Sequence, residues 1–229
     1  MTAEAKARIY LAAQRGCTQT DWYRSFNTFN FGEYQDENRK PFGAVHACND
    51  DTLKPGGKIT FEAPQDIYIL LLPVVGGINF SIEGQTPILL EAGDGQWLFL
   101  RERDELEISN PFDIELVNFL HLWIAETQTG SQLQIQKLFF DVDANKNLLQ
   151  PLKVIGHGVG CLGKFDGRKG STYRVNHPTE GLFIFVVEGA FEVQNRLLQS
   201  RDALALWNVD EVAFEALSNE AVILMIDTL

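Results

Sequence analysis

The feature that most constrains this chain is a pattern of strand, glycine turn, strand, aspartate-containing turn and strand, which occurs twice. The two copies are residues 74–80, 89–94 and 104–108 in the first half and residues 186–191, 197–202 and 210–214 in the second half. An internal repeat of this kind is best explained by two copies of one β-domain. We therefore expect two tandem domains that share one strand order.

Short runs of alternating apolar and polar residues dominate the chain. In one of them, Leu106 and Ile108 share one face of a strand and Glu105 and Glu107 share the other. Glycine, asparagine and aspartate clusters separate the runs at intervals of about 8–12 residues, which is typical of a β-sandwich or barrel. Outside residues 1–12 and 143–149, no window of helical length keeps an apolar stripe. The predicted fold class is all-β, with two jelly-roll barrels that hide their strand edges by closure.

The predicted domains are residues 1–130 and residues 131–229, and the polar stretch 141–150 is the natural linker between them. The net charge of −12 and the lack of any basic run argue against direct binding of nucleic acid. The most apolar stretch, residues 67–82, is shorter than a bilayer span and contains Pro73, Gly76 and Gly77. We therefore expect neither a nucleic-acid partner nor a membrane partner.

Cysteine usage indicates the compartment. Cys17, Cys48 and Cys161 are an odd number of cysteines, lie far apart and form no Cys-x-x-Cys pair. This pattern excludes a disulfide framework and a thiolate zinc site, and it fits a reducing environment. The first 15 residues contain no apolar core of the kind that a signal peptide needs. The predicted location is the cytoplasm.

Residues 22–34, which read WYRSFNTFNFGEY, resemble the opening block of the pirin family, which belongs to the cupin superfamily. Phe42-Gly43-Ala44-Val45 and Asn49-Asp50-Asp51 are similar to the next pirin block. Later blocks are similar to Asn110-Pro111, Leu122-Trp123-Ile124 and residues 203–207, so the resemblance spans nearly the whole chain. It implies two cupin barrels in tandem, a bicupin.

The resemblance also implies a chemistry. Pirins usually hold one iron in the amino-terminal barrel through three histidines and one glutamate, a ligand set that leaves positions open for oxygen or substrate. Some bacterial relatives oxidise flavonols such as quercetin, and the mammalian protein acts as a nuclear transcriptional cofactor. These properties are implications of the family.

This chain departs from the family at the metal ligands. The strand at 61–69 should contain His-Pro-His and has no histidine. Counting forward from Asp51 puts Glu62 and Pro64 at the two histidine positions, whereas counting back from Gly77 puts Ala63 and Gln65 there. The second half of the motif, His-x-Glu, is replaced by Leu106 and Ile108. We therefore expect a degenerate metal site and no cofactor.

The remaining polar candidates do not rebuild the iron site. His46, His121, His157 and His177 are scattered, and His121 lies in an apolar strand, where a histidine with satisfied hydrogen bonds is the simpler interpretation. Glu62, Asp66 and Tyr68 are the polar residues that could line a pocket of the first barrel. No catalytic residue is predicted.

Three functions follow as hypotheses. The first is a non-catalytic protein that binds a small molecule, or a regulatory protein that binds another protein. The second is a metal-dependent quercetin 2,3-dioxygenase, as in active relatives, which would need iron held without histidine. The third is a metal-independent cupin enzyme that uses carboxylates. The sequence favours the first, because all the expected histidines are absent together and the second motif is occupied by aliphatic residues.

Overall fold

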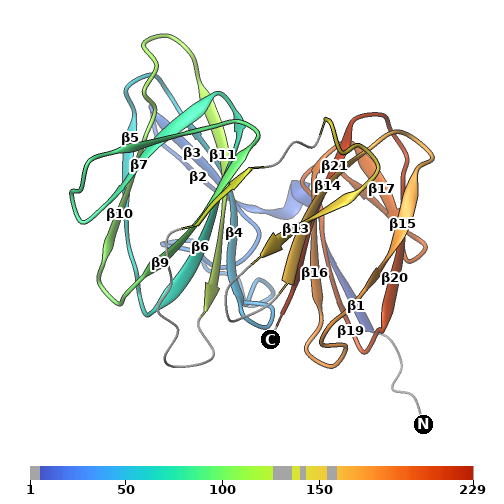
Figure 1. Cartoon of the computed structure of the whole chain (residues 1–229). Coiled ribbons are helices and arrows are strands. Elements are labelled where there is room, and N and C mark those ends of the chain that lie inside the picture. Colours follow the sequence, from blue (N-terminus) through green and yellow to red (C-terminus); the bar gives the residue numbers. More distant parts are fainter. Residues whose placement is uncertain (1–5, 126–135, 140–142, 154–158, 229) are drawn as a thin grey trace. The chain divides into compact units, whose positions relative to one another are not determined.

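The computed structural model describes residues 6–125, 136–139, 143–153 and 159–228 (Figure 1). The chain divides into two compact units, which we call the first barrel (Gly16–Phe140) and the second barrel (Met1–Arg15 with Asp141–Leu229). Strands dominate both units, and the only helical element among the described residues is a short 3-10 turn, η1 (Ala12–Gln14). In these residues no helix is long and apolar enough to span a bilayer. The all-β prediction is confirmed.

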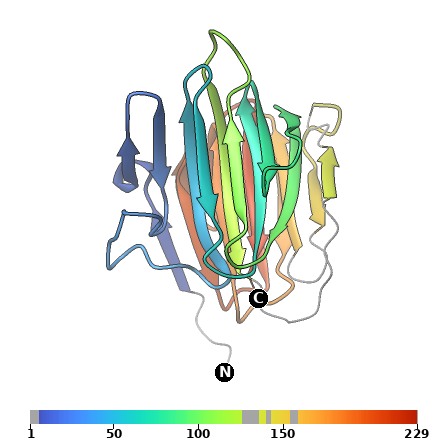
Figure 2. The same ribbon diagram turned by 90° about the vertical axis from the view of Figure 1, so that its left-hand side faces the viewer.

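The first barrel consists of a seven-stranded and a four-stranded antiparallel sheet, and the blue β2–β3 hairpin lies at one edge of the larger sheet (Figure 2). The seven-stranded sheet has the order β12-β9-β6-β11-β4-β3-β2. Its strands are β2 (Gly16–Gln19), β3 (Tyr23–Asn27), β4 (Val45–Leu53), β6 (Ile67–Val75), β9 (Asp94–Leu100), β11 (Val117–Ala125) and β12 (Gln136–Phe139). The four-stranded sheet, in the order β5-β10-β7-β8, comprises β5 (Lys58–Glu62), β7 (Gly77–Ile82), β8 (Ile88–Glu91) and β10 (Glu105–Ser109).

The second barrel repeats this arrangement with a six-stranded and a four-stranded sheet, in the orders β1-β19-β16-β21-β14-β13 and β15-β20-β17-β18. The six strands are β1 (Lys6–Tyr10), β13 (Leu149–Lys153), β14 (Val159–Phe165), β16 (Leu182–Glu188), β19 (Ala203–Trp207) and β21 (Ala221–Asp227). The four strands are β15 (Gly170–Arg174), β17 (Ala190–Val193), β18 (Arg196–Gln199) and β20 (Glu211–Ala216).

The strand orders of the two barrels correspond element by element. The series β9-β6-β11-β4 of the first barrel matches β19-β16-β21-β14 of the second, and β5-β10-β7-β8 matches β15-β20-β17-β18. Each barrel buries its own apolar cluster, because alternate side chains along every strand point into the interior. The repeat read from the sequence therefore corresponds to a structural repeat.

The amino-terminal strand lies in the second barrel, whereas the predicted domain 1–130 would place it in the first. β1 pairs with β19 over its whole length, so it completes the edge of the larger sheet of the second barrel. The backbone N–H of Ala12 then donates a hydrogen bond to Asp202 at 2.7 Å. The backbone groups at the edge of β19 would otherwise be unpaired, and β1, which lies outside the repeat, pairs with them.

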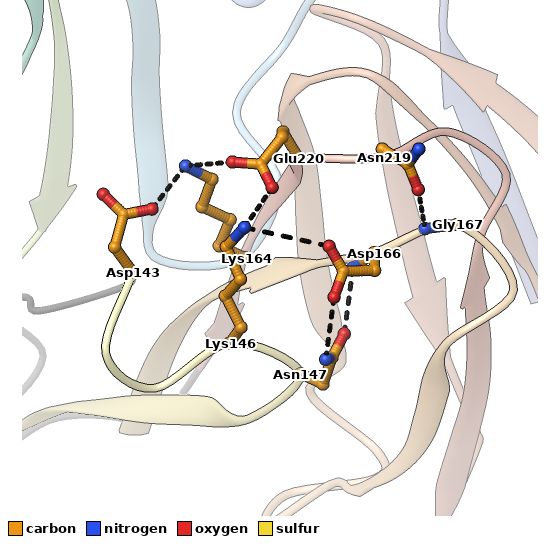
Figure 3. Close-up of polar contacts among 8 residues, drawn as sticks. All are labelled: Asp143, Lys146, Asn147, Lys164, Asp166, Gly167, Asn219 and Glu220. Carbon is orange, nitrogen blue, oxygen red and sulfur yellow. Dashed lines mark hydrogen bonds and ion pairs between the residues drawn. The ribbon is translucent and has the colours of Figure 1, made fainter.

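The predicted linker also belongs mainly to the second barrel, whose second segment begins at Asp141. Its described residues are held by the polar contacts of Figure 3, in which the Lys164 ammonium lies 2.6 Å from Asp143 and 2.7 Å from Glu220. Lys146 forms an ion pair with the same Glu220 carboxylate. Hydrogen bonds from Lys146 and Lys164 lower the pKa of Glu220. These contacts connect the turn that precedes β13 with Lys164 of β14 and with Glu220, which precedes β21.

The place of β1 can be tested with adjacent residues on opposite faces of the strand. Tyr10 is 4% exposed and Ile9 is 41% exposed. We expect Tyr10→Ala to reduce the free energy of unfolding by about 2–3 kcal/mol, because it removes a buried aromatic side chain that lies across from Ala203 of β19. Ile9→Ala should cost no more than about 0.5 kcal/mol.

Hydrogen exchange locates the effect. In Tyr10→Ala the backbone amides of β19 should exchange faster while those of β11 keep their protection. Equal losses of stability in the two variants, or equal loss of protection in the two strands, would contradict the assignment of β1 to the second barrel.

Candidate functional site

The strand that replaces the second half of the metal motif is β10. Leu106 and Ile108 are both fully buried in the core of the first barrel. Between them, Glu107 points the other way and pairs with Lys58 at 2.8 Å. The side that would carry a histidine and a glutamate in the family is therefore occupied by two aliphatic side chains.

The partner strand β5 shows which residues face these aliphatics. Phe61 lies directly across from Leu106 in the strand register, and both Phe61 and Ala63 belong to the buried core. Glu62 is exposed on the other face. Strand alternation thus turns Phe61 and Ala63 inward, a pair that differs from both registers considered in the sequence.

Only one residue of those two registers faces the interior. Pro64 and Gln65 are exposed in the turn after β5, and Ala63 alone is buried. Phe61 falls outside both counts, from Asp51 and from Gly77, although its alternation with Ile59 was a signal available in the sequence.

An iron held by three histidines and a glutamate does not fit the interior of this barrel. The inward positions on β10 and around the end of β5 hold Phe61, Ala63, Leu106 and Ile108, which have no nitrogen or oxygen in their side chains to donate to a metal. Among the described residues, no three histidine, cysteine, aspartate or glutamate side chains are grouped so that they could hold a metal ion. His177 is exposed in the second barrel, and His157 lies outside the described residues.

A pocket of about 440 Å³ opens on the first barrel, within the range of small-molecule sites. Its apolar lining is Phe31, Pro41, Ala47, Phe61, Pro64, Ile67 and Trp123. Its polar lining is Asn30, Gln35, His46, Thr60 and Glu62. The rings of Phe31, Phe61 and Trp123 meet edge to face, with centroid distances of 5.3–5.9 Å. The pocket therefore joins an aromatic wall to a hydrogen-bonding rim.

The structure separates the three polar residues that were expected to line a pocket. Glu62 lines it. Asp66 instead accepts a hydrogen bond from the backbone N–H of Glu102 at 2.9 Å in an exposed turn. Tyr68 is fully buried, and its ring lies 5.0 Å from that of Phe99. Tyr68 is directed away from the pocket because its neighbour Ile67 takes the inward position on β6.

A buried chain of hydrogen bonds begins at Trp123 in the pocket wall. The indole Nε1–H of Trp123 donates to Nδ1 of His121 at 2.7 Å. Nε2 of His121 lies 3.0 Å from Oδ2 of Asp51, and the Tyr23 hydroxyl donates to the same oxygen at 2.8 Å. An indole N–H can only donate, so Nδ1 carries no proton, and Nε2–H is the donor to Asp51. His121 is a neutral histidine with both nitrogens engaged.

Two pKa shifts belong to this region. Burial, with the nearby Asp51 carboxylate as a second cause, raises the pKa of the Tyr23 hydroxyl far above its usual value. Burial also lowers the pKa of His46 in the pocket lining. Both residues are therefore neutral at physiological pH.

The apolar replacement of the metal motif makes a prediction for β10. We expect Leu106→His to reduce the free energy of unfolding by about 3 kcal/mol, because it buries a polar ring without partners. Its melting temperature should be the same with nickel(II) and with a chelator. Glu105→His, on the exposed face of the same strand, should stay within about 0.5 kcal/mol of wild type. Stabilisation of Leu106→His by nickel(II) would contradict this account.

The lowered pKa of His46 makes a prediction for pH dependence. Below about pH 6.5 the unfolded chain takes up a proton on this imidazole more readily than the folded chain does. Stability contributed by neutral His46 is therefore present above that pH and is lost as the pH falls through the folded pKa. In urea unfolding between about pH 7.5 and about pH 5.5, His46→Gln should lose less stability than wild type, and the control His177→Gln should behave like wild type. Identical pH profiles for wild type and His46→Gln would contradict it.

Comparison with known proteins agrees with this architecture. A sequence model of the quercetinase C-terminal cupin domain matches residues 160–228. Over nearly its whole length the chain is 26% identical to quercetin 2,3-dioxygenase of Escherichia coli K12, covering 94% of this chain and 97% of that protein.

Solved structures show the same fold. The crystal structure of YhhW from Escherichia coli superimposes with a TM-score of 0.86 at 21% identity, over 98% of both chains. The nickel(II) complex of YhhW, described as a bacterial pirin, gives a TM-score of 0.83 at 22% identity over 98% of this chain and 100% of that one. The repeated barrels, the full-length relatives and the carboxyl-terminal domain match agree: this chain has the bicupin fold and is distantly similar to the pirins and quercetinases.

Proposed function

We propose that this bicupin binds a small molecule in the pocket of the first barrel and does so without the iron chemistry of its relatives. The observation that carries the proposal is the dual position of Phe61. Its ring lies in the pocket wall and also belongs to the core, directly across from Leu106, which replaces a ligand of the family's metal motif. One aromatic side chain thus joins the binding wall to the apolar positions of β10, where ligand atoms for iron would be needed.

The lining indicates the class of molecule. Edge-to-face rings of Phe31, Phe61 and Trp123 favour a flat aromatic ligand, which gains stacking as well as apolar burial. His46 and Glu62 at the rim can hydrogen-bond hydroxyl groups. The relatives are named for quercetin, a flat aromatic molecule with several hydroxyls, so a flavonol is the first probe to use.

The proposal includes a role in the cell. A cytoplasmic protein that binds a flavonol-like molecule and does not convert it acts as a carrier or as a sensor, and a sensor needs a partner protein that distinguishes the bound from the free form. The support is the pairing of a preformed pocket with an interior that offers no donor set for iron.

The binding half of the proposal is tested by titrating quercetin into the protein by calorimetry. We expect saturable binding of one quercetin per chain. Glu62→Gln and Phe31→Leu should each weaken it about tenfold, through loss of the negative charge that strengthens a rim hydrogen bond and through a lost aromatic contact. Their controls are Glu105→Gln, directly across from Glu62 but outside the pocket, and Phe112→Leu, which is exposed elsewhere on the barrel.

The catalytic half is tested by oxygen consumption with quercetin and added Fe(II), Mn(II), Ni(II) or Cu(II). We expect no consumption above that of quercetin and metal without protein. Metal-dependent consumption that requires the protein would overturn the proposal in favour of a dioxygenase. Absence of binding, or equal weakening in the control variants, would remove the pocket from the function.

A further inference from the structure

A second polar site lies inside the first barrel, on strands β3 and β4. Three buried oxygens there have no hydrogen-bond partner among the described residues: Oδ1 of Asn27, Oδ1 of Asn49 and Oδ1 of Asp51. Asn49 and Asp51 are fully buried, and Asn27 is 2% exposed. The amide nitrogen of Asn49 is equally unpartnered. Unsatisfied buried polar atoms in such number are costly unless a ligand or ordered water meets them.

The strand register brings these side chains together. Asn27 lies directly across from Asn49, and Asp51 is two residues from Asn49 on the same strand, so the three share one face of the sheet. That face is the interior, because Ala47 and Leu53 on the same face of β4 belong to the core. Directly paired residues on one face have Cβ atoms about 5 Å apart.

The amide of Asn27 presents its carbonyl oxygen to the site. Its Nδ2 donates to the Ser25 hydroxyl oxygen at 3.0 Å, which leaves the carbonyl oxygen for a ligand. The unpartnered atoms of the site are therefore three acceptor oxygens and one donor nitrogen, Nδ2 of Asn49. An excess of acceptor oxygens suits a cation more than an anion or an apolar molecule.

The charge of the site points the same way. Oδ2 of Asp51 accepts two hydrogen bonds, from Tyr23 and His121, as an ionised carboxylate does. A proton on Oδ1 would have no acceptor among the described residues. His121 is neutral because it accepts from Trp123, and no lysine or arginine of the described residues pairs with Asp51. One buried negative charge therefore has no counter-charge.

We propose that Asn27, Asn49 and Asp51 form a binding site for one monovalent alkali cation inside the first barrel. One carboxylate with two neutral amide oxygens matches a single positive charge, and oxygen ligands of this type suit hard cations. The site is separate from the pocket, whose lining includes none of the three residues. It uses oxygen ligands on β3 and β4, whereas the residues that replace the family's iron motif lie on β10 and in and after the end of β5.

The test is thermal unfolding of the intact protein, prepared without alkali salts, at equal ionic strength in sodium, potassium or choline chloride. We expect sodium or potassium to raise the melting temperature by about 5 °C over choline, saturably. Asn49→Leu should abolish the difference between salts. Asn118→Leu is the matched control, since Asn118 lies on the other face and donates to Asp50 at 2.7 Å. It should lower the melting temperature equally in all three salts.

A direct measurement on the wild type keeps the test independent of whether Asn49→Leu folds. Sodium-23 NMR should show line broadening by the protein that potassium reverses by competition. Equal melting temperatures in the three salts together with no broadening would overturn the proposal and leave these oxygens to ordered water.

Discussion

The structure of each barrel depends on strand alternation: successive side chains point in turn into the interior and out of it. Each inward position of the first barrel is either part of the core or part of a polar cluster, and the next residue along must face outward. This constraint makes Leu106 and Ile108 act together, since both lie on the inward face of β10. An apolar residue at one former ligand position, such as Leu106, also makes the surroundings of its inward neighbours less polar.

The interior of the first barrel is divided between its two sheets. The smaller sheet contributes aliphatic and aromatic side chains such as Phe61 and Leu106, whereas the larger sheet carries the buried chain that runs from Tyr23 through Asp51 and His121 to Trp123. The larger sheet carries the buried polar groups, whereas the smaller sheet is apolar where the family's ligands would lie. Trp123 links the two regions, because its ring lines the pocket while its N–H is held by His121.

Much of the fold could be predicted from the sequence. The alternating runs form strands, and the repeated pattern forms two barrels with matching strand orders. The place of β1 could not, since Lys6–Tyr10 lies outside the repeat and buries only Tyr10 deeply. The inward orientation of Leu106 and Ile108 follows from period two alone. The inward orientation of Phe61 is indicated by its alternation with Ile59, but the contact of His121 with Asp51 joins residues 70 positions apart, which no local pattern reveals.

We propose that the interior of the first barrel, where β10 carries Leu106 and Ile108, binds no transition metal. The most direct measurement is the transition-metal content of untagged protein by elemental analysis, before and after incubation with Fe(II) or Ni(II) and removal of the excess. The account predicts far less than one equivalent of metal per chain and a melting temperature that is unchanged by chelator. Near one equivalent of iron, nickel or zinc, lost on chelation together with part of the stability, would contradict it.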